Sequence, residues 1–226
     1  MQDSSELFTI FPVFLLVDVS ASMAGGPIEA LNKALPEMKQ EMLSNPTVGE
    51  IARVGLVTFS DEARTVVPLS DLAYADIPEV LVEGGTNFAA GFRGVRAAID
   101  AGLGSLPKGT PIYRPVVFFM SDGMHQARED WVPALELLRD PKWKFRPEVV
   151  TFGFADAKGD ALGRIANRYA FMAKDRDPAV QVREIMNALI GSIVTTSTSF
   201  RDPTQTGGLH LNTPTEHFAQ LPTLAT

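Results

Sequence analysis

A chain of 226 residues, 45% hydrophobic and 21% charged, is long enough for one sizeable α/β domain and a short extension. Its net charge of −7, with no run of lysine or arginine, argues against nucleic-acid binding and suits a basic partner or a cation. The absence of cysteine excludes disulfides, thiolate zinc sites and cysteine nucleophiles. No apolar run reaches membrane-spanning length, and the N-terminal run makes a poor signal peptide, so we expect a cytoplasmic protein without a membrane contact.

Apolar strands and amphipathic helices alternate along the chain. After a lead-in over residues 1–9, apolar runs predict strands at residues 11–19, 51–60, 64–69, 114–120, 148–154 and 169–172. Apolar spacings of three and four predict helices at residues 27–44, 88–103, 128–139, 161–167 and 179–195, with a further short helix within 71–82. We expect Pro36 to kink the first helix or break it in two. The alternation predicts an α/β fold with a doubly wound, mostly parallel sheet, helices on both faces, and one antiparallel edge strand at 64–69.

The composition shifts near the C-terminus. Residues 1–195 are expected to form one domain, and residues 196–226 are rich in threonine, proline and glycine and lack a sustained helical period. We interpret this extension as an extended tail or a loose hairpin, disordered or pinned by a partner.

Polar oxygen-bearing side chains follow three of the apolar segments. The strand PVFLLV ends on Asp18, with Ser20 and Ser22 at alternate positions after it; Thr86 follows two glycines where a helix begins; and Asp122 follows VVFFMS. Because the carboxyl ends of parallel strands lie at one edge of a sheet, these groups can converge there. Carboxylate and hydroxyl oxygens select Mg²⁺, Mn²⁺ or Ca²⁺ over zinc or copper. Since hydroxyls are neutral, a cation at this edge stays electrophilic and attracts an acidic ligand.

The ordered set DVSAS, GGTNF and FMSDG resembles the von Willebrand factor A domain over residues 8–195. That family has a Rossmann-like three-layer sandwich fold and a metal-ion-dependent adhesion site (MIDAS) made from DxSxS, a threonine and an aspartate. The resemblance implies Mg²⁺ or Mn²⁺, with Ca²⁺ as a third candidate, held by the residues Asp18, Ser20, Ser22, Thr86 and Asp122. It also implies that the hydroxyls bind directly, that one or both aspartates bind through water, and that a Glu or Asp of a protein partner completes the coordination.

Three longer stretches are similar to a compact cytoplasmic bacterial subgroup associated with tellurite resistance, the TerY-like proteins. The stretches are DVSASMAGGPIEALNKAL, VGLVTFSDEARTVVPLSDL and RPVVFFMSDG. The subgroup implies a partner that is a protein kinase or a PP2C-type phosphatase in a stress-response system. It more often has glycine where Ala21 stands and an acidic residue where Gly26 stands.

Purely structural roles for these residues are alternatives to the metal site. Asp18, Ser20 and Ser22 could cap a helix or turn, Thr86 could be a helix N-cap, and Asp122 with a glycine after it could form a plain turn. We expect Ser60 and Asp61 to be structural or to support the site from outside it, and His125 to be a surface residue or a partner contact.

The function expected from these residues is a metal-dependent protein-interaction module, not an enzyme, because no nucleophile–base pair is evident. One alternative is a Mg²⁺-dependent phosphoryl-transfer enzyme with Asp18 as nucleophile, as in haloacid-dehalogenase-like phosphatases, although that family wants a second Asp where Ser20 stands. A nucleotide-binding protein lacks its GxxxxGK[ST] motif here. A structural subunit that assembles through the tail, and a VWA partner of an AAA+ ATPase, are the remaining alternatives.

Overall fold

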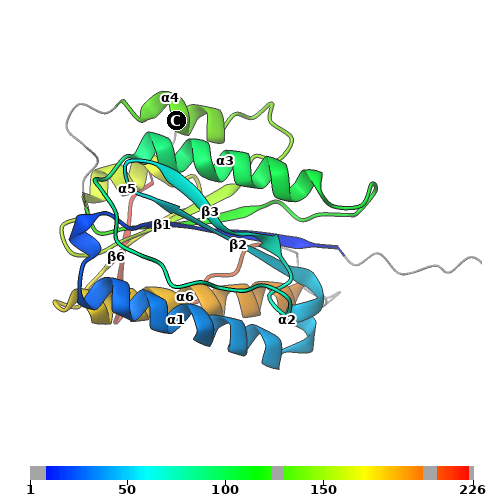
Figure 1. Cartoon of the computed structure of the whole chain (residues 1–226), viewed down its shortest axis with the longest axis horizontal. Helices are drawn as coiled ribbons and strands as arrows, with labels where there is room; N and C mark the ends of the chain where they lie inside the picture. Colours follow the sequence, from blue (N-terminus) through cyan, green and yellow to red (C-terminus); the bar gives the residue numbers. More distant parts are fainter. Residues whose placement is uncertain (1–8, 124–129, 201–207, 224–226) are drawn as a thin grey trace, which may run out of the picture.

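The computed structural model describes residues 9–123, 130–200 and 208–223. One seven-stranded sheet, in the order β3-β2-β1-β4-β5-β6-β7, lies between two layers of helices (Figure 1). The strands are β1 (Phe11–Asp18), β2 (Ala52–Phe59), β3 (Ala63–Ser70), β4 (Val116–Ser121), β5 (Glu148–Gly153), β6 (Tyr169–Ala173) and β7 (Phe218–Leu221). The helices are a 3₁₀ turn η1 (Ala21–Met23), α1 (Gly26–Ser44), α2 (Pro46–Ile51), α3 (Phe88–Gly104), α4 (Val132–Leu138), α5 (Gly159–Ile165) and α6 (Pro178–Ser199).

The sheet is mostly parallel, as the alternation of elements predicts. β1 pairs in parallel with β2 and β4, and β5 and β6 continue the parallel ladder. The hairpin partner β3 is the expected antiparallel edge strand. The expectation of a single antiparallel edge was wrong, because β7 pairs antiparallel with β6 at the other edge.

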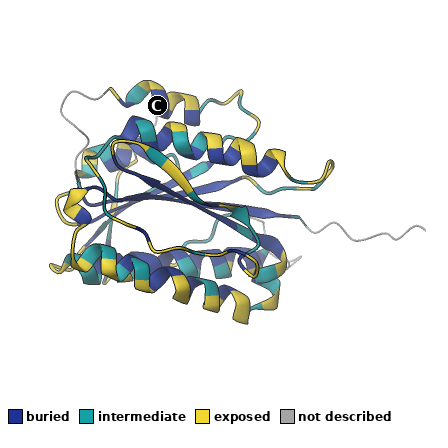
Figure 2. Cartoon of the chain, viewed as in Figure 1, coloured by how far each residue is buried: buried dark blue, intermediate teal, exposed yellow. Residues whose placement is uncertain are grey.

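The central strand β1 is buried on both faces, which explains its unbroken apolar sequence. Its alternate residues belong to two different cores: Val13 and Leu15 pack with α1 and α6, and Phe14 and Leu16 pack with α3, α4 and α5. Figure 2 shows this arrangement as buried strands between helices that are buried only on their inner sides. The polar carboxyl ends of the strands therefore follow segments that are packed on both faces of the sheet.

Two local features differ from the sequence expectations. Pro36 does not break α1 in two, since the helix runs continuously from Gly26 to Ser44. Pro36 is exposed, while the buried side of α1 packs against α6. The short helix expected within residues 71–82 is absent: the segment crosses the molecule as turns and extended chain, anchored where the Asn32 side chain exchanges two hydrogen bonds with the Val80 backbone, at 2.8 and 2.9 Å.

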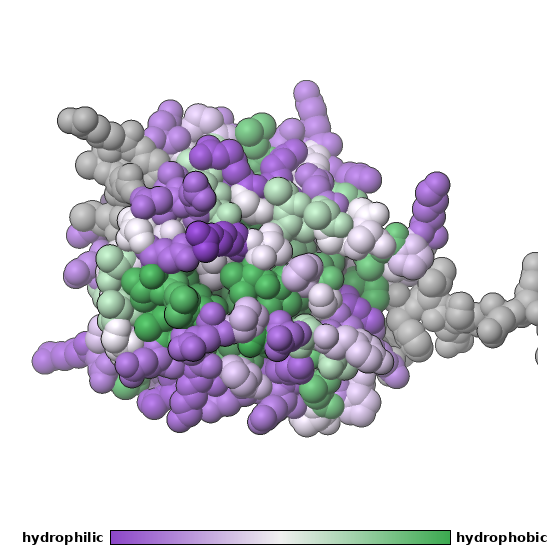
Figure 3. Space-filling view, viewed as in Figure 1, coloured by the Kyte–Doolittle hydropathy of each residue, from purple (hydrophilic) through white to green (hydrophobic). Residues whose placement is uncertain are grey.

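The face that this segment crosses carries apolar surface in its middle, bordered by hydrophilic side chains (Figure 3). Leu81, in the segment, is 66% exposed. None of the helices in the described ranges combines the length and hydropathy needed to cross a membrane.

The C-terminal extension is ordered over its described part, which corrects the expectation of a loose tail. Helix α6 continues to Ser199, and residues 208–223 then fold back along the domain. The Thr196 hydroxyl exchanges hydrogen bonds with the backbone of His210, and the Ser192 hydroxyl accepts one from the Asn212 amide at 2.8 Å. The extension lacks a helical period because it adds an edge strand to the sheet.

Phe218 anchors this strand, so Phe218→Ala is expected to lower the free energy of unfolding by about 3 kcal/mol. Its ring is 3% exposed and packs edge-on against Phe152 and Phe171, with ring centroids 5.6 and 6.3 Å away. Urea denaturation measures the loss, with Gln220→Ala as the matched control because Gln220 lies on the same strand and is exposed. A loss below about 0.5 kcal/mol for Phe218→Ala would show that the strand adds nothing to stability.

Candidate metal centre

The candidate metal residues lie at the carboxyl edge of the parallel sheet, on the left in Figure 1. Asp18 is the last residue of β1, and Ser20 and Ser22 follow in the tight turn that includes η1. Asp122 follows directly after β4, the parallel neighbour of β1. Thr86 lies in the loop before α3. Neighbouring parallel strands thus place two carboxylates and two serines beside one another.

Hydrogen bonds join these residues into one network. Asp18 accepts from the Ser20 amide through Oδ1, at 2.9 Å, and from the Ser121 hydroxyl through Oδ2, at 2.6 Å. The Ser22 hydroxyl donates to Asp122 Oδ1 at 2.8 Å, and the Ser20 and Ser22 hydroxyl oxygens are 3.1 Å apart. Because the Ser22 proton goes to Asp122, Ser20 must be the donor in the contact between the serines. Lone pairs of the Ser20 oxygen are left for another ligand.

Backbone contacts bring the loop of Thr86 to the same place. The Ala21 amide donates to the Gly84 carbonyl at 3.1 Å, and the Asn87 amide donates to the Ser60 carbonyl at 2.8 Å. A Cβ added at Gly123 would lie 3.9 Å from Ser22 Oγ and 4.0 Å from Thr86 Oγ1, so both hydroxyls border one point beside Asp122. Within the described residues, the Thr86 hydroxyl has no hydrogen-bond partner, unlike the serine hydroxyls.

Gly84 and Asp61 explain how this loop holds its shape. Gly84 has a φ of +52°, a conformation that glycine adopts without strain, and a side chain there would collide with the Asp61 carboxylate. Gly84 thus leaves room for the Asp61 carboxylate beside the loop, and the structural or supporting role expected for Asp61 stays a prediction. Its neighbour Ser60 is buried and gives the loop a carbonyl acceptor.

Burial dominates the electrostatics of both carboxylates. Asp18 is fully buried, and its desolvation raises its pKa from 3.8 to about 6, although the hydrogen bonds from Ser121 and Ser20 favour the ionised form. Burial also raises the pKa of Asp122, opposed by the Ser22 hydrogen bond and reinforced by the charge of Asp156. An unbalanced negative charge at this edge is costly, and a cation would relieve the cost.

Sequence reasoning missed two residues at this edge. Ser121 is the last residue of β4, and its hydroxyl donates to Asp18 and orients it. Its position directly before Asp122 could have identified it in the sequence. Asp156 donates its amide to the Asp122 carbonyl at 3.0 Å, and its place after an apolar strand was the signal. His125 lies outside the described residues.

The donor set fits a hard divalent cation. It combines two carboxylates with hydroxyls from Ser20, Ser22 and Thr86, all oxygen ligands of the kind that Mg²⁺ and Mn²⁺ accept. No group of three or more Asp, Glu, His or Cys gathers into a metal-binding cluster in the described parts of the chain. A site of this composition depends on neutral hydroxyls as well as on its two carboxylates.

Residues 13–125 match the von Willebrand factor type A domain family, and the chain belongs to that family. The fold and the ordered DxSxS, Thr and Asp residues agree with this membership. No curated protein matches the chain.

Solved structures share the fold at low sequence identity. Proximal thread matrix protein 1 from the mussel byssus, in a structure with a zinc-occupied MIDAS motif, is 17% identical over 84% of this chain and 49% of its own, with a TM-score of 0.59. A von Willebrand factor type A protein from Catenulispora acidiphila is 16% identical over 82% of this chain and 43% of its own, with a TM-score of 0.60.

The pilus adhesin SpaC from Lactobacillus rhamnosus GG, in its open conformation, is 16% identical over 82% of this chain and 30% of its own, with a TM-score of 0.64. The present chain thus spans less than half the length of each of these three solved proteins. Structural similarity at this low sequence identity establishes the fold alone.

The raised pKa of Asp18 predicts how the stability of the metal-free protein depends on pH. Between pH 3.8 and about 6, the folded protein keeps the Asp18 proton that the unfolded chain has lost. Asp18 therefore reduces stability progressively as pH rises through this window, by about 3 kcal/mol in total, and the loss persists above it. Urea denaturation in EDTA, at several pH values, measures the effect as the difference between the wild type and Asp18→Asn. A difference that does not change with pH would contradict the assignment.

Asp18→Asn is also expected to abolish stabilisation by Mn²⁺ while leaving the metal-free fold at least as stable as the wild type at pH 8. The amide is isosteric and uncharged, and the Ser121 hydroxyl can rotate to accept from it. Wild-type protein should gain about 2.7 kcal/mol of stability when Mn²⁺ is present at a hundred times its Kd. Thermal denaturation with Mn²⁺ and with EDTA measures both effects, and equal Mn²⁺ stabilisation of the variant would exclude Asp18 from the site.

Proposed function

We propose that this chain is a metal-dependent protein-interaction module whose MIDAS residues hold Mg²⁺ or Mn²⁺ and bind a Glu or Asp side chain of a partner protein. The observation that carries the proposal is the network of Asp18, Ser20, Ser22 and Asp122 at the carboxyl edge of the sheet, with the Thr86 hydroxyl bordering it. The cation would supply a positive charge to which an external carboxylate can bind.

The arrangement of the ligands supports binding of an outside acid. The carboxylate of Asp18 is fully buried behind the serine turn, whereas Ser22 is exposed and Thr86 is half-buried. The Ser22 and Thr86 hydroxyls therefore lie on the outer side of the site, where a partner would approach. Since hydroxyls bring no charge, a cation there retains more attraction for a carboxylate than it would in a cage of acids.

The environment of Asp18 also argues against the phosphoryl-transfer alternative. A nucleophilic aspartate needs an oxygen that is accessible to a phosphate ester. Asp18 is 0% exposed, and each of its oxygens accepts a hydrogen bond, from the Ser20 amide and the Ser121 hydroxyl. These contacts suit a residue that positions a turn and balances charge, and we propose that the protein is not an enzyme.

The cellular system is part of the same proposal. The likeness of the three long stretches to the TerY-like subgroup favours a cytoplasmic bacterial stress-response system linked to tellurite resistance, with a protein kinase or a PP2C-type phosphatase as partner. An AAA+ ATPase is the alternative partner.

The two departures from the subgroup pattern differ in consequence. Ala21 is exposed in η1 and leaves the metal turn intact. A Cβ at Gly26 would lie 3.1 Å from the Ala179 Cβ of α6, so an acidic residue there would require α6 to pack farther from the start of α1.

Thr86→Ala is the sharpest test of metal-dependent partner binding, and we expect it to reduce partner capture at least about tenfold in Mg²⁺. No described residue bonds to the Thr86 hydroxyl, so its removal should leave the melting temperature of the metal-free protein unchanged. Thr86→Ser is the matched control, because it keeps the hydroxyl and should keep binding. Capture of the kinase or phosphatase by the immobilised chain, in Mg²⁺ and in EDTA, provides the measurement.

Two results would contradict the proposal. One is partner capture that is equal in Mg²⁺ and EDTA, or equal for Thr86→Ala and Thr86→Ser. The other is turnover of a phosphate ester by the purified chain that disappears in Asp18→Asn, which would instead support the phosphoryl-transfer alternative.

A further inference from the structure

A second polar site lies at the opposite edge of the sheet from the metal centre. Arg114 lies just before β4, Glu148 is the first residue of β5, and Arg168 directly precedes β6, so these residues mark the amino ends of three parallel strands. Arg139, after α4, and Arg164, in the last turn of α5, approach the same place. Together with Arg146 these residues line a pocket of about 590 Å³, which we call the arginine pocket.

The charge of this pocket is opposite in sign to that of the whole protein. Five arginines and two glutamates line it, an excess of three positive charges in a chain whose net charge is −7. The arginines are spread between positions 114 and 168, so the sequence contains no basic run that reveals them. Only the fold brings them together.

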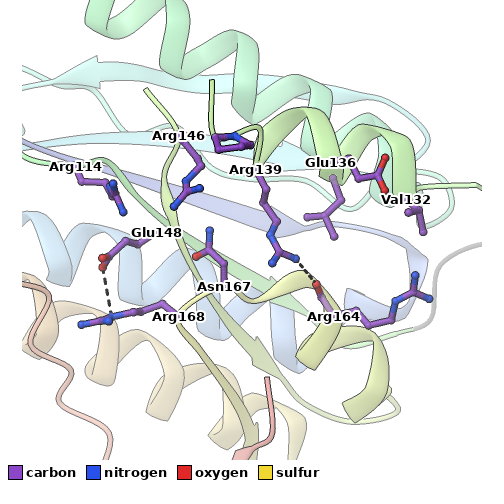
Figure 4. Close-up of a pocket in the computed structure, with 11 residues that line it drawn as sticks. Arg114, Val132, Glu136, Arg139, Arg146, Glu148, Arg164, Asn167 and Arg168 are labelled. Carbon is purple, nitrogen blue, oxygen red and sulfur yellow. Dashed lines mark hydrogen bonds and ion pairs between the residues drawn. The ribbon is translucent and has the colours of Figure 1, made fainter. Parts of the chain in front are cut away.

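The side chains do not all face the cavity in the same way. In Figure 4 the Arg139 side chain points toward the Arg164 carbonyl and the Arg146 side chain points toward the side of the pocket where Arg114 lies, while the Arg164 guanidinium and Glu136 extend away. The Arg164 guanidinium lies over the Trp131 ring, 5.2 Å from its centroid.

Two contacts among the described residues engage arginines of the pocket. Arg168 pairs with Glu148 at 3.7 Å, and Arg139 donates to the Arg164 carbonyl at 2.8 Å. Among the described residues, neither Arg114 nor Arg146 takes part in an ion pair. Among the described residues that line the pocket, two glutamates face five arginines.

Arg139 and Arg146 bring like charges to the lining of one cavity. Burial lowers the pKa of Arg139 from its ordinary value, and the positive charge of Arg146 lowers it further. Both side chains are half-buried, so solvent screens this repulsion incompletely. Binding sites often hold like charges near one another, although their repulsion lowers the stability of the fold. A ligand of opposite charge relieves that repulsion when it binds.

We propose that the arginine pocket binds a small ligand that carries a diphosphate group, with Arg114, Arg139 and Arg146 as its main contacts. The planar guanidinium donates two parallel hydrogen bonds to phosphate oxygens, and several guanidiniums can share one diphosphate. Each phosphate group carries roughly −1.5 to −2 charges at neutral pH, so a diphosphate matches the excess of three positive charges better than a single carboxylate does.

The space around the arginines also suits a ligand larger than an inorganic ion. A neighbouring pocket of about 420 Å³ shares Arg114 and Arg146 with the first and adds Lys144 and Trp143 to the lining. Both volumes lie in the range of small-molecule sites. An organic group attached to the diphosphate has room there, so the source can be inorganic diphosphate or a nucleoside diphosphate.

This site is separate from the proposed function, because it lies at the amino ends of β4, β5 and β6, whereas Asp18 and Asp122 lie at the carboxyl ends of β1 and β4. Its test is run in EDTA, so that a diphosphate cannot act by removing a cation from the metal centre. Failure of partner binding and failure of this site are therefore distinguishable.

Titration calorimetry with pyrophosphate, inorganic phosphate and ADP, at matched ionic strength, tests the site. We expect pyrophosphate to bind at least about tenfold more tightly than phosphate, and Arg146→Gln to weaken pyrophosphate binding at least about tenfold. Arg93→Gln is the matched control, because Arg93 is exposed on α3 away from the pocket and loses the same charge. ADP that binds more tightly than pyrophosphate identifies a nucleoside diphosphate as the source, and weaker ADP binding identifies the inorganic ion.

The melting temperature provides a second measurement on the same variants. Without ligand, Arg146→Gln should melt no lower than the wild type, because it removes the repulsion with Arg139, and it should lose the rise that pyrophosphate causes in the wild type. Arg114→Gln, at an exposed position, repeats the test with little risk to folding.

Three results would overturn the proposal. They are equal affinity for phosphate and pyrophosphate, an equal loss of binding in Arg93→Gln and Arg146→Gln, and tighter binding of oligoglutamate than of pyrophosphate. The last result would assign the pocket to an acidic protein segment.

Discussion

The burial of Asp18 at the carboxyl end of β1 is the constraint on which the candidate metal site depends. A carboxylate with no solvent exposure must be hydrogen-bonded, and the Ser20 amide and the Ser121 hydroxyl provide the bonds. These bonds join the turn after β1 to the end of β4, so they position the serine hydroxyls as well as the carboxylate. The remaining cost of the buried charge raises its pKa and makes a cation the natural counter-charge.

The sheet makes this arrangement possible. β1 is an interior strand, buried on both faces, with the parallel neighbours β2 and β4 on either side, so polar groups from several loops meet at one edge. The Thr86 loop is tied to this edge by backbone bonds to the loops after β1 and β2. The same parallel order brings the amino ends of β4, β5 and β6 together at the other edge, where the arginine pocket lies. Two sites of opposite charge thus follow from one topology.

Much of the fold was predictable because its determinants are local. Apolar runs and helical spacings identified the strands and main helices, and the hairpin partner β3 followed from its closeness to β2. The features that the sequence did not predict depend on tertiary contacts. The α1 helix continues through Pro36, which is exposed to solvent. The strand β7 forms where the Phe218 ring packs against aromatic rings of β5 and β6. Neither feature follows from a periodic pattern of apolar residues in the sequence.

The candidate metal residues could be named from the sequence for a similar reason. Asp18, Ser20 and Ser22 stand within five positions, and Thr86 and Asp122 each follow a clear local signal. The arginine pocket could not be predicted, since its members come from four separate segments and none is unusual in its own surroundings. Spatial convergence of ordinary residues is visible only in the folded chain.

A crystal structure of the chain grown with Mn²⁺, with an anomalous difference map, tests the central claim most directly. The account predicts one anomalous peak at the carboxyl edge of the sheet, within coordination distance of the hydroxyl oxygens of Ser20, Ser22 and Thr86. A well-ordered crystal at saturating Mn²⁺ with no peak there, or with a peak bound only by carboxylates elsewhere, would contradict it.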